Sequence, residues 1–277
     1  MIKILITGAN SYIGKNVECW LSQFENQYTI DTLDMLDENW KNYNFRNYDV
    51  VFHVAGIAHR KETKDNAELY YRVNERLAID VAQRAKEQGV KQFIILSSMS
   101  VYGLTVGHIT KQTVPKPNSN YGKSKYNADK KILDMSCDSF KVAILRPPMV
   151  YGKGCKGNYQ SLRSVAIKSP IFVDYHNERS MIYVGNLAAF VKEVIEGDKY
   201  GVFFPQDAEY VSTSDMVRKI AESNGKKIHY VSLMNWAIRL MLRMPINVVK
   251  KVFGTLTYEK VDLVSLYDFD DAMKETE

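Results

Sequence analysis

The chain has 277 residues, of which 45% are hydrophobic, and its formal net charge is +5 at pH 7. This length and composition suit one large globular domain, or two closely joined ones, with a sizeable core. The basic excess would favour small anionic ligands, but it is too small to indicate a nucleic-acid-binding protein. The three cysteines, Cys19, Cys137 and Cys155, have neither metal-ligand spacing nor the pattern of a disulfide framework. They predict free thiols in a reducing compartment and no metal site.

The sequence carries no sign of a membrane-spanning or secreted protein. No apolar run is long enough to cross a bilayer. The first residues, 1–8, run directly into a strand and a glycine turn, which leaves no room for a signal peptide. We therefore expect a cytoplasmic protein.

The first half of the chain alternates short β-branched runs with longer helical patterns. Strands are predicted at 2–6, 28–33, 50–54, 93–96 and 142–145, and helices at 13–22, 66–88 and 121–134. Strands that alternate with helices indicate βαβ units and a parallel sheet covered on both faces. We therefore predict an α/β fold of the Rossmann type, a doubly wound parallel sheet, with a dinucleotide-binding domain at 1–155.

The second half has a looser pattern. One more βα unit at 181–195 is predicted to return to the main sheet, so that 180–196 would belong to the first domain. Most of 156–277 would then form a smaller C-terminal substrate-binding lobe over the carboxyl edge of the sheet. The acidic last residues, 268–277, are expected to fray.

Segment 234–253 alternates apolar residues with basic ones, and it is interrupted at Pro245. The favoured interpretation is a packed pair of amphipathic helices broken at the proline. The alternative is a segment that lies on a membrane surface. The basic residues concerned are Arg239, Arg243, Lys250 and Lys251.

A glycine-containing turn, Thr7-Gly8-Ala9-Asn10-Ser11-Tyr12-Ile13-Gly14, joins the first strand to the first helix. Gly8 would make the tight turn, and Gly14 would let the helix pack closely on the strand. Ser11 stands where a glycine usually lets backbone N–H groups approach a pyrophosphate, and the helix N-terminus supplies partial positive charge. The turn follows a strand and opens a helix, which favours a dinucleotide site over an ordinary βα turn.

Asp34 ends the second predicted strand, about twenty residues after the turn. A carboxylate there accepts hydrogen bonds from a ribose diol and repels a 2′-phosphate, so it favours NAD over NADP. Asp31 is a rival, although it lies inside the strand. The alternative for Asp34 is a solvated strand end.

Tyr121 and Lys125 lie four residues apart, which on a helix places them on one face, roughly 6 Å apart along the axis. A nearby ammonium group favours the phenolate and would lower the tyrosine pKa, so that the phenol could exchange a proton with a substrate hydroxyl. Ser98 follows a strand and could orient the reacting oxygen. The spacing alone is common on surface helices, and local capping is the alternative role for the serines, more so for Ser97 and Ser100 than for Ser98.

With these residues assembled, the chain resembles the extended short-chain dehydrogenase/reductase family, specifically its NAD-dependent epimerase/dehydratase branch, over about residues 1 to 195. Besides the glycine turn and Asp34, the resemblance rests on His53-Val-Ala-Gly56, Arg72-Val-Asn74, Ser97-Ser-Met-Ser-Val-Tyr-Gly103, Tyr121-Gly-Lys-Ser-Lys125, Arg146-Pro-Pro-Met-Val-Tyr-Gly152 and Arg179-Ser-Met-Ile-Tyr-Val-Gly-Asn-Leu187.

The resemblance implies roles for individual residues. It implies Ser98, Tyr121 and Lys125 as catalytic residues, and Ser98, Tyr121 and Arg179 as substrate-binding residues. A bidentate guanidinium at Arg179 suits a substrate diphosphate, although Arg179 could instead pair with Glu178 or Asp174 on the surface. The cofactor-binding positions are Gly8, Asn10, Ser11, Tyr12, Ile13, Gly14, Asp34, Met35, Val54, Ala55, Gly56, Asn74, Tyr121, Lys125 and Pro148. Helices 66–88 and 121–134 are the expected interface of a homodimer.

Departures from the family narrow the expected chemistry. Family dehydratases carry Asp-Glu after the catalytic Ser or Thr, whereas this chain has Met99-Ser100, which argues against dehydration. Galactose-type 4-epimerases usually carry Asn where this chain has Pro148-Met149. The Arg-Pro-Pro form and Phe253-Gly-Thr-Leu256 look more like sugar-modifying members from polysaccharide loci, including 4-keto reductases.

We therefore predict NAD-dependent oxidoreduction at C4 of a nucleotide-sugar, nominally by a UDP-sugar 4-epimerase of polysaccharide precursor synthesis. The alternative is an NAD(P)H-dependent reductase of a UDP-4-keto-6-deoxy sugar. A non-catalytic dinucleotide sensor, and a protein that binds nucleic acid or membranes, remain as weaker alternatives.

Overall fold

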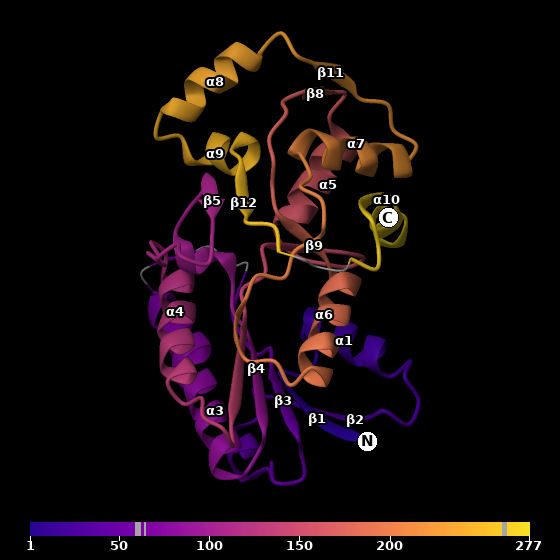
Figure 1. Ribbon diagram of the computed structural model, residues 1–277. Coiled ribbons are helices and arrows are strands. Elements are labelled where there is room, and N and C mark those ends of the chain that lie inside the picture. The colour runs from indigo at the N-terminus through magenta and orange to yellow at the C-terminus, as the bar shows by residue number, and fades with distance from the viewer. Residues whose placement is uncertain (59–61, 64, 262–264) are drawn as a thin grey trace. The chain divides into compact units, whose positions relative to one another are not determined.

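The computed structural model describes residues 1–58, 62–63, 65–261 and 265–277. The chain divides into two compact units (Figure 1). Unit 1 comprises residues 1–103, 115–147 and 187–205. Unit 2 comprises residues 104–114, 148–186 and 206–277.

Six parallel strands form the sheet of unit 1. In spatial order they are β10 (Gly201–Phe203), β6 (Lys141–Leu145), β4 (Gln92–Leu96), β3 (Val50–His53), β1 (Ile2–Thr7) and β2 (Tyr28–Leu33). The chain moves from β1 to β2 on one side and then crosses to β3 on the other. Sheets of this kind bind ligands where the winding reverses, beyond the carboxyl ends of the strands. The predicted Rossmann-type doubly wound fold is confirmed.

Helices cover both faces of this sheet (Figure 1). On one face, α1 (Tyr12–Leu21) and α6 (Val184–Glu196) bury Val17, Leu21 and Val191 against the strands. On the other face lie α3 (Ala78–Glu87) and α4 (Asn120–Leu133), which bury Val81 and Ile132. The predicted helix 66–88 consists of α2 (Ala67–Tyr70), a π-helical segment η2 (Tyr71–Leu77) and α3. Short 3-10 segments are η1 (Glu38–Asn42) and η3 (Met99–Tyr102).

The βα unit predicted at 181–195 returns to unit 1 only through its helix, because its strand does not join the main sheet. The strand is short. It forms β9 (Met181–Tyr183), which pairs with β7 (Met149–Tyr151) in a separate two-stranded sheet of unit 2. Asp207 holds β9 there, because its carboxylate accepts two hydrogen bonds from Tyr183 N–H, at 3.1 and 3.0 Å, and one of 3.1 Å from Tyr151 Oη. From Leu187 onward α6 belongs to unit 1, and the strand that joins the main sheet is the following one, β10.

Unit 2 contains two further pairs of short parallel strands and most of the C-terminal helices. Strand β5 (Gly107–Ile109) pairs with β12 (Leu256–Tyr258), and β8 (Ile171–Val173) pairs with β11 (His229–Val231). The helices are α5 (Asn158–Lys168), α7 (Thr213–Ser223), α8 (Asn235–Arg243), α9 (Asn247–Phe253) and α10 (Phe269–Thr276). Among the described residues, no helix is both long and apolar enough to cross a membrane.

The expectation that the acidic C-terminus frays is wrong. Residues 269–276 form α10, which packs on α7 and buries Ala272 and Met273. Asp268 Oδ1 caps the helix by accepting a 2.8 Å hydrogen bond from the Asp271 N–H. The acidic residues therefore serve the helix N-terminus, where negative charge is stabilising.

The predicted pair of amphipathic helices in segment 234–253 is confirmed. It forms α8 and α9, which pack on each other with Pro245 between them. Within α8, Ile238 is the buried residue.

Candidate functional site

The turn between β1 and α1 depends on glycines that leave no room for a side chain. Gly8 has a φ of +115°, and a Cβ atom there would lie 2.6 Å from Ala55 N. A Cβ atom at Gly14 would lie 2.5 Å from Ser11 Oγ and 3.1 Å from Val54 Cγ2. Ser11 caps α1, because its Oγ accepts a 3.1 Å hydrogen bond from the Gly14 N–H. Serine at this position therefore gives the helix a cap, and β1, α1 and the end of β3 approach closely.

The remaining residues of the turn complete the start of the helix. Asn10 has a φ of +67°, a left-handed conformation that asparagine tolerates better than most residues. Tyr12 is the first residue of α1, and Ile13 packs against the buried cluster under the sheet. The N-terminus of α1 thus lies at the carboxyl end of β1, where a helix dipole favours an anion.

Asp34 lies at the end of β2, in register with the ends of β1 and β3. Thr7 pairs with Leu33 of β2 and with His53 of β3, so the three strands end together. Asp34 is exposed, and its Oδ1 accepts a 2.9 Å hydrogen bond from the Leu36 N–H. Its rival Asp31 accepts a 2.7 Å hydrogen bond from Tyr48 Oη. Met35 is partly buried and packs against the hydrophobic core.

Gly56, Asn74 and Lys125 come together from three elements of unit 1. A Cβ atom at Gly56 would lie 3.1 Å from Asn74 Oδ1 and 3.2 Å from Lys125 Nζ. Asn74 lies in the π-helical segment, and its side chain bonds both backbone groups of Ile57, accepting from N–H at 2.7 Å and donating to the carbonyl at 3.0 Å. Lys125 Nζ donates a 2.8 Å hydrogen bond to the Leu96 carbonyl. The loop after β3 is therefore held against α4 beside a lysine ammonium group. Such π-helical turns are frequent at functional sites.

Ser98 and Tyr121 meet where β4 ends and α4 begins. The Ser98 side chain lies beside the Tyr121 phenol and lowers its pKa. The same Ser98 caps η3, because its Oγ accepts a 3.1 Å hydrogen bond from the Ser100 N–H. The expectation that Ser97 is a cap sooner than Ser98 is wrong, because Ser97 Oγ donates a 2.8 Å hydrogen bond to the buried Asp129.

The start of α4 fixes Tyr121 by a contact that the sequence analysis missed. Glu62 accepts hydrogen bonds from the N–H groups of Asn120, at 3.0 Å, and Tyr121, at 2.9 Å. Ser119 Oγ caps the same turn by accepting a 3.0 Å bond from the Gly122 N–H. A carboxylate at a helix N-terminus is favourable, but nothing in the local sequence pointed to Glu62, which lies nearly sixty residues earlier.

The expected effect of Lys125 on the Tyr121 phenol is wrong for this state of the protein. Burial raises the pKa of Tyr121 above its usual 10.0, and the negative charge of Asp129 acts in the same direction. Ser98 is the one neighbour that lowers the pKa of Tyr121. The physical reason is that α4 spacing brings Lys125 to the same face, but its Nζ is directed to the Leu96 carbonyl.

A buried network beneath Lys125 was also missed. Asp129 Oδ2 accepts hydrogen bonds from Ser97 Oγ and from Arg146 Nε, the latter at 2.9 Å, and Arg146 donates at 3.0 Å to Tyr102 Oη. Burial lowers the pKa of Lys125 to about 8, although Asp129 counteracts this. Asp129 continues the four-residue spacing of Tyr121 and Lys125 along one helix face, and that spacing was the signal that could have identified it.

Pro148 and Arg179 belong to unit 2 and are described within it. Pro148 directly precedes β7. Arg179 is partly buried and donates a 2.8 Å hydrogen bond to the Gly254 carbonyl. The surface pairing considered for it is absent among the described residues, since Asp174 pairs with Arg218 at 3.1 Å. Burial lowers the pKa of Arg179, as expected for a cation without a neighbouring carboxylate.

Residues 4–203 match the model of the NAD dependent epimerase/dehydratase family. The chain belongs to this family. A relative from the same family is a UDP-glucose 4-epimerase from Vibrio cholerae, 33% identical over 76% of this chain and 68% of that protein. A second relative is an N-acetyl-α-D-glucosaminyl-diphospho-ditrans,octacis-undecaprenol 4-epimerase from Escherichia coli O157:H7, 27% identical over 81% of this chain and 73% of that protein. A similar fold is seen in the crystal structure of a UDP-glucuronic acid 4-epimerase from Bacillus cereus, solved in complex with NAD. It gives a TM-score of 0.75 at 18% identity, over 99% of this chain and 97% of that one.

Proposed function

We propose that this protein is an NAD-dependent epimerase acting at C4 of a sugar that is linked through a diphosphate, nominally a UDP-sugar. The observation that carries the proposal is the convergence of Ser98, Tyr121 and Lys125 at the carboxyl edge of the sheet, next to the loop at Gly56. A phenol, a hydroxyl and an ammonium group in one place can exchange a proton with a sugar hydroxyl and orient it. Family membership supports an enzyme of this type.

The residues of unit 1 fit an NAD molecule. The Gly8–Gly14 turn offers a helix N-terminus without obstructing side chains, which suits the pyrophosphate. Asp34 would accept hydrogen bonds from the adenine ribose diol, because its carboxylate is exposed and makes no ion pair among the described residues. Lys125 and Asn74 would line the nicotinamide end of the cleft. When bound, NAD would accept hydride from the sugar carbon and return it.

The protein's own part in the reaction is proton transfer and orientation. Tyr121 would take the proton from the sugar hydroxyl as the carbon is oxidised and give it back after reduction. Ser98 lies beside the phenol and would share the reacting oxygen with it. Lys125 would hold the ribose hydroxyls of the bound nucleotide.

Arg179 is the proposed contact to the substrate diphosphate, because its guanidinium makes no ion pair among the described residues and forms a fork that matches phosphate oxygens. The two relatives named above act on sugars joined through a diphosphate to different carriers, uridine in one and a polyprenol in the other. The diphosphate is the chemical group that the substrates of both relatives share. We also propose a cytoplasmic location, and a homodimer formed through α3 and α4 with their neighbours.

The test is to incubate the purified enzyme with UDP-glucose or UDP-N-acetylglucosamine without added NADH and to follow the C4 epimer by NMR. Product is expected for wild type. The Tyr121→Phe variant should lose about 10²- to 10⁴-fold in kcat. The matched control is Tyr126→Phe on the same helix, whose ring lies over Lys130 and which should remain active.

Two results would contradict the epimerase proposal. Turnover only with a 4-keto sugar and added NAD(P)H would identify the reductase instead. Unchanged turnover in Tyr121→Phe would remove the catalytic assignment altogether.

A further inference from the structure

Helix α8 has apolar residues on two opposite sides. Ile238 is 3% exposed and faces the interior of unit 2. On the other side, Trp236 and Leu240 are 70% and 54% exposed. The same stripe continues at three- and four-residue spacing to Leu233, just before the helix, and to Met244, its C-cap. These two side chains are 83% and 48% exposed. A surface helix normally carries polar residues on its outward side, so this side is suited to a second apolar surface.

The neighbouring helix also exposes an apolar residue. Val248 of α9 is 71% exposed, and α9 packs against α8. We call Leu233, Trp236, Leu240, Met244 and Val248 the apolar face. Exposed basic side chains accompany it, namely Arg239, Arg243 and Lys251.

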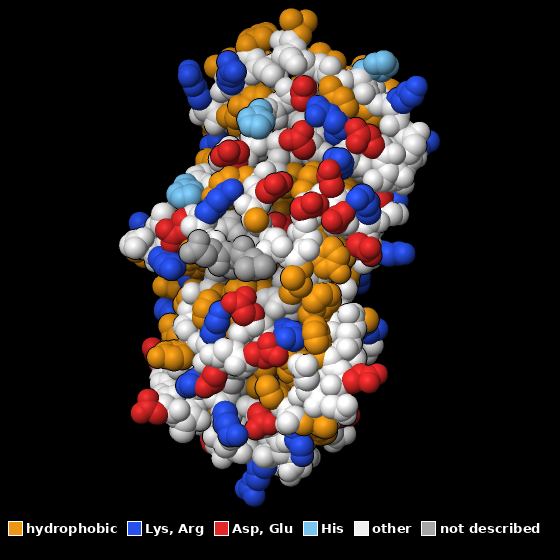
Figure 2. Space-filling model, turned by 45° about the vertical axis from the view of Figure 1, so that its right-hand side comes forward, with side chains coloured by type: hydrophobic (Ala, Val, Ile, Leu, Met, Phe, Trp, Pro, Cys, Tyr) orange, Lys and Arg blue, Asp and Glu red, His pale blue; other side chains and the backbone are white. Residues whose placement is uncertain are grey.

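The charge of the chain is concentrated around this face. Residues 223–258 contain six Lys and Arg and no Asp or Glu, so the rest of the chain carries a formal charge of −1 within the total of +5. In Figure 2 the top edge of the view exposes hydrophobic side chains with basic ones on either side, and most acidic side chains lie lower. A second copy docked on the apolar face would bring two positive segments together, which argues against a self-association surface. An anionic surface is complementary to it.

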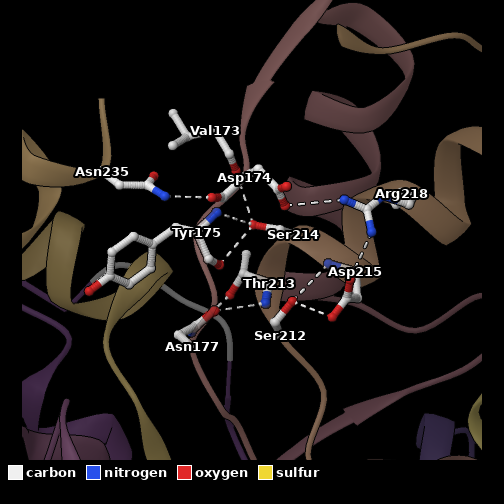
Figure 3. A network of polar contacts seen from close by, with 10 residues as sticks. All are labelled: Val173, Asp174, Tyr175, Asn177, Ser212, Thr213, Ser214, Asp215, Arg218 and Asn235. Atoms are coloured by element: carbon white, nitrogen blue, oxygen red, sulfur yellow. Dashed lines mark hydrogen bonds and ion pairs between the residues drawn. The ribbon is translucent and has the colours of Figure 1, made fainter. Parts of the chain in front are cut away.

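The face is held in place by polar contacts at both ends of the helix pair. Asn235 Nδ2, at the start of α8, donates a 2.9 Å hydrogen bond to the Asp174 carbonyl (Figure 3). On either side of Asp174, the carbonyls of Val173 and Tyr175 each accept a 3.0 Å hydrogen bond from Ser214 Oγ. Thr213 Oγ1 donates to the Val252 carbonyl at 2.6 Å, near the end of α9. The outward direction of the apolar face is therefore fixed by unit 2.

We propose that α8 and α9 dock unit 2 on the surface of an anionic lipid bilayer, with the apolar face inserted at the headgroup level. Tryptophan and leucine suit this depth, and arginine and lysine beside them meet anionic headgroups. Lipid supplies both partners that the face requires, an apolar layer and negative charge. The proposal goes beyond the proposed activity and holds independently of it.

The test uses the full chain and sedimentation with vesicles of phosphatidylcholine, with or without about one third phosphatidylglycerol. Wild type should bind the anionic vesicles, bind neutral ones weakly, and be released between about 0.1 M and 0.5 M salt, as the Debye length shortens. Each basic residue near an anionic surface is worth about fivefold in partitioning, so Arg239→Gln with Arg243→Gln should lose about 25-fold. The matched control, Lys91→Gln with Lys168→Gln, removes two exposed charges elsewhere and should bind as wild type.

The apolar part is tested separately. Trp236→Ser with Leu240→Ser should reduce binding about tenfold or more, whereas Tyr200→Ser, which removes an exposed aromatic ring in unit 1, should not. Vesicles should also shift the tryptophan emission to the blue, and Trp236→Phe should bind but lose the shift. Urea unfolding checks that every variant is folded.

The proposal is overturned if wild type does not bind anionic vesicles at low salt, or if the glutamine variants at 239 and 243 bind like their control. It is also overturned if the serine variants at 236 and 240 bind normally, because adsorption would then be electrostatic only. If wild type sediments as an oligomer and does not bind vesicles, and the serine variants at 236 and 240 sediment as monomers, the apolar face would instead be the contact with a second copy of the chain.

Discussion

Lys125 is buried with a positive charge, and this burial has a measurable thermodynamic consequence. Its side chain is almost inaccessible, with a 5% exposed fraction, and its pKa falls from the usual 10.5 to about 8 because of burial. Between these two values the unfolded chain holds a proton that the folded protein has released. The free energy of unfolding must therefore rise with pH across this window. A pKa difference of about 2.5 units gives Lys125 an unfavourable contribution of about 3 kcal/mol at neutral pH.

The perturbation is Lys125→Met, which removes the titrating group but keeps an unbranched apolar side chain. From about pH 7 to pH 10, wild type should gain about 2 to 3 kcal/mol in unfolding free energy relative to this variant. The assay is urea denaturation of nucleotide-free protein at a series of pH values. Lys123→Met on the exposed side of the same helix is the control and should run parallel to wild type. If wild type and Lys125→Met also run parallel, Lys125 is not a desolvated ammonium group and its place in the site must be revised.

Two further predictions follow from the surroundings of the site. Asp34→Ala should weaken NAD binding about tenfold to 100-fold in calorimetry, because it removes a pair of hydrogen bonds to a charged group, and it should leave NADP binding no weaker. If the ratio of the NAD and NADP affinities does not change, Asp34 is only a solvated residue at the end of the strand. Asp129→Asn should destabilise the fold by about 3 to 5 kcal/mol in urea, because Arg146 would lose its buried partner, and it should lower the pKa of Lys125 further. Asp134→Asn, exposed at the end of the same helix, is the control, and an equal loss there would refute the buried-pair argument.

Helices and strands in which apolar residues recur at regular spacing were predictable from the sequence. Strand β2 has the predicted bounds of 28–33, and α4 differs by one residue at each end from the predicted 121–134. The π-helical segment at 71–77 could not be predicted, because one widened turn leaves the apolar pattern of a helix almost unchanged. The strand at 201–203 is too short to show alternation, and its pairing with β6 decides its place. Helix α10 was missed because its stability comes from docking on α7.

The site was predictable where chemistry lies in neighbouring residues. The glycine turn, Asp34 and the Tyr121–Lys125 pair each carry their signal within one element and its ends. Contacts that join distant segments carry no such signal, as Glu62 on the start of α4 illustrates. Burial is equally hard to predict from the sequence, because the pKa of Tyr121 depends on all the residues packed around the ring.

The raised pKa of Tyr121 leads to a last prediction, about when the phenol becomes acidic. In the protein alone, burial outweighs the influence of Ser98 and the phenol stays protonated. An oxidised nicotinamide ring carries a positive charge, which favours a phenolate, whereas the reduced ring is neutral. We therefore expect the Tyr121 pKa to fall when NAD binds and to stay high with NADH. The measurement is a near-ultraviolet phenolate titration of wild type minus Tyr121→Phe, with each nucleotide in turn. Equal pKa values with both nucleotides would mean that the acidity of Tyr121 is not linked to the charge of the ring, and the base would then have to be sought in another group.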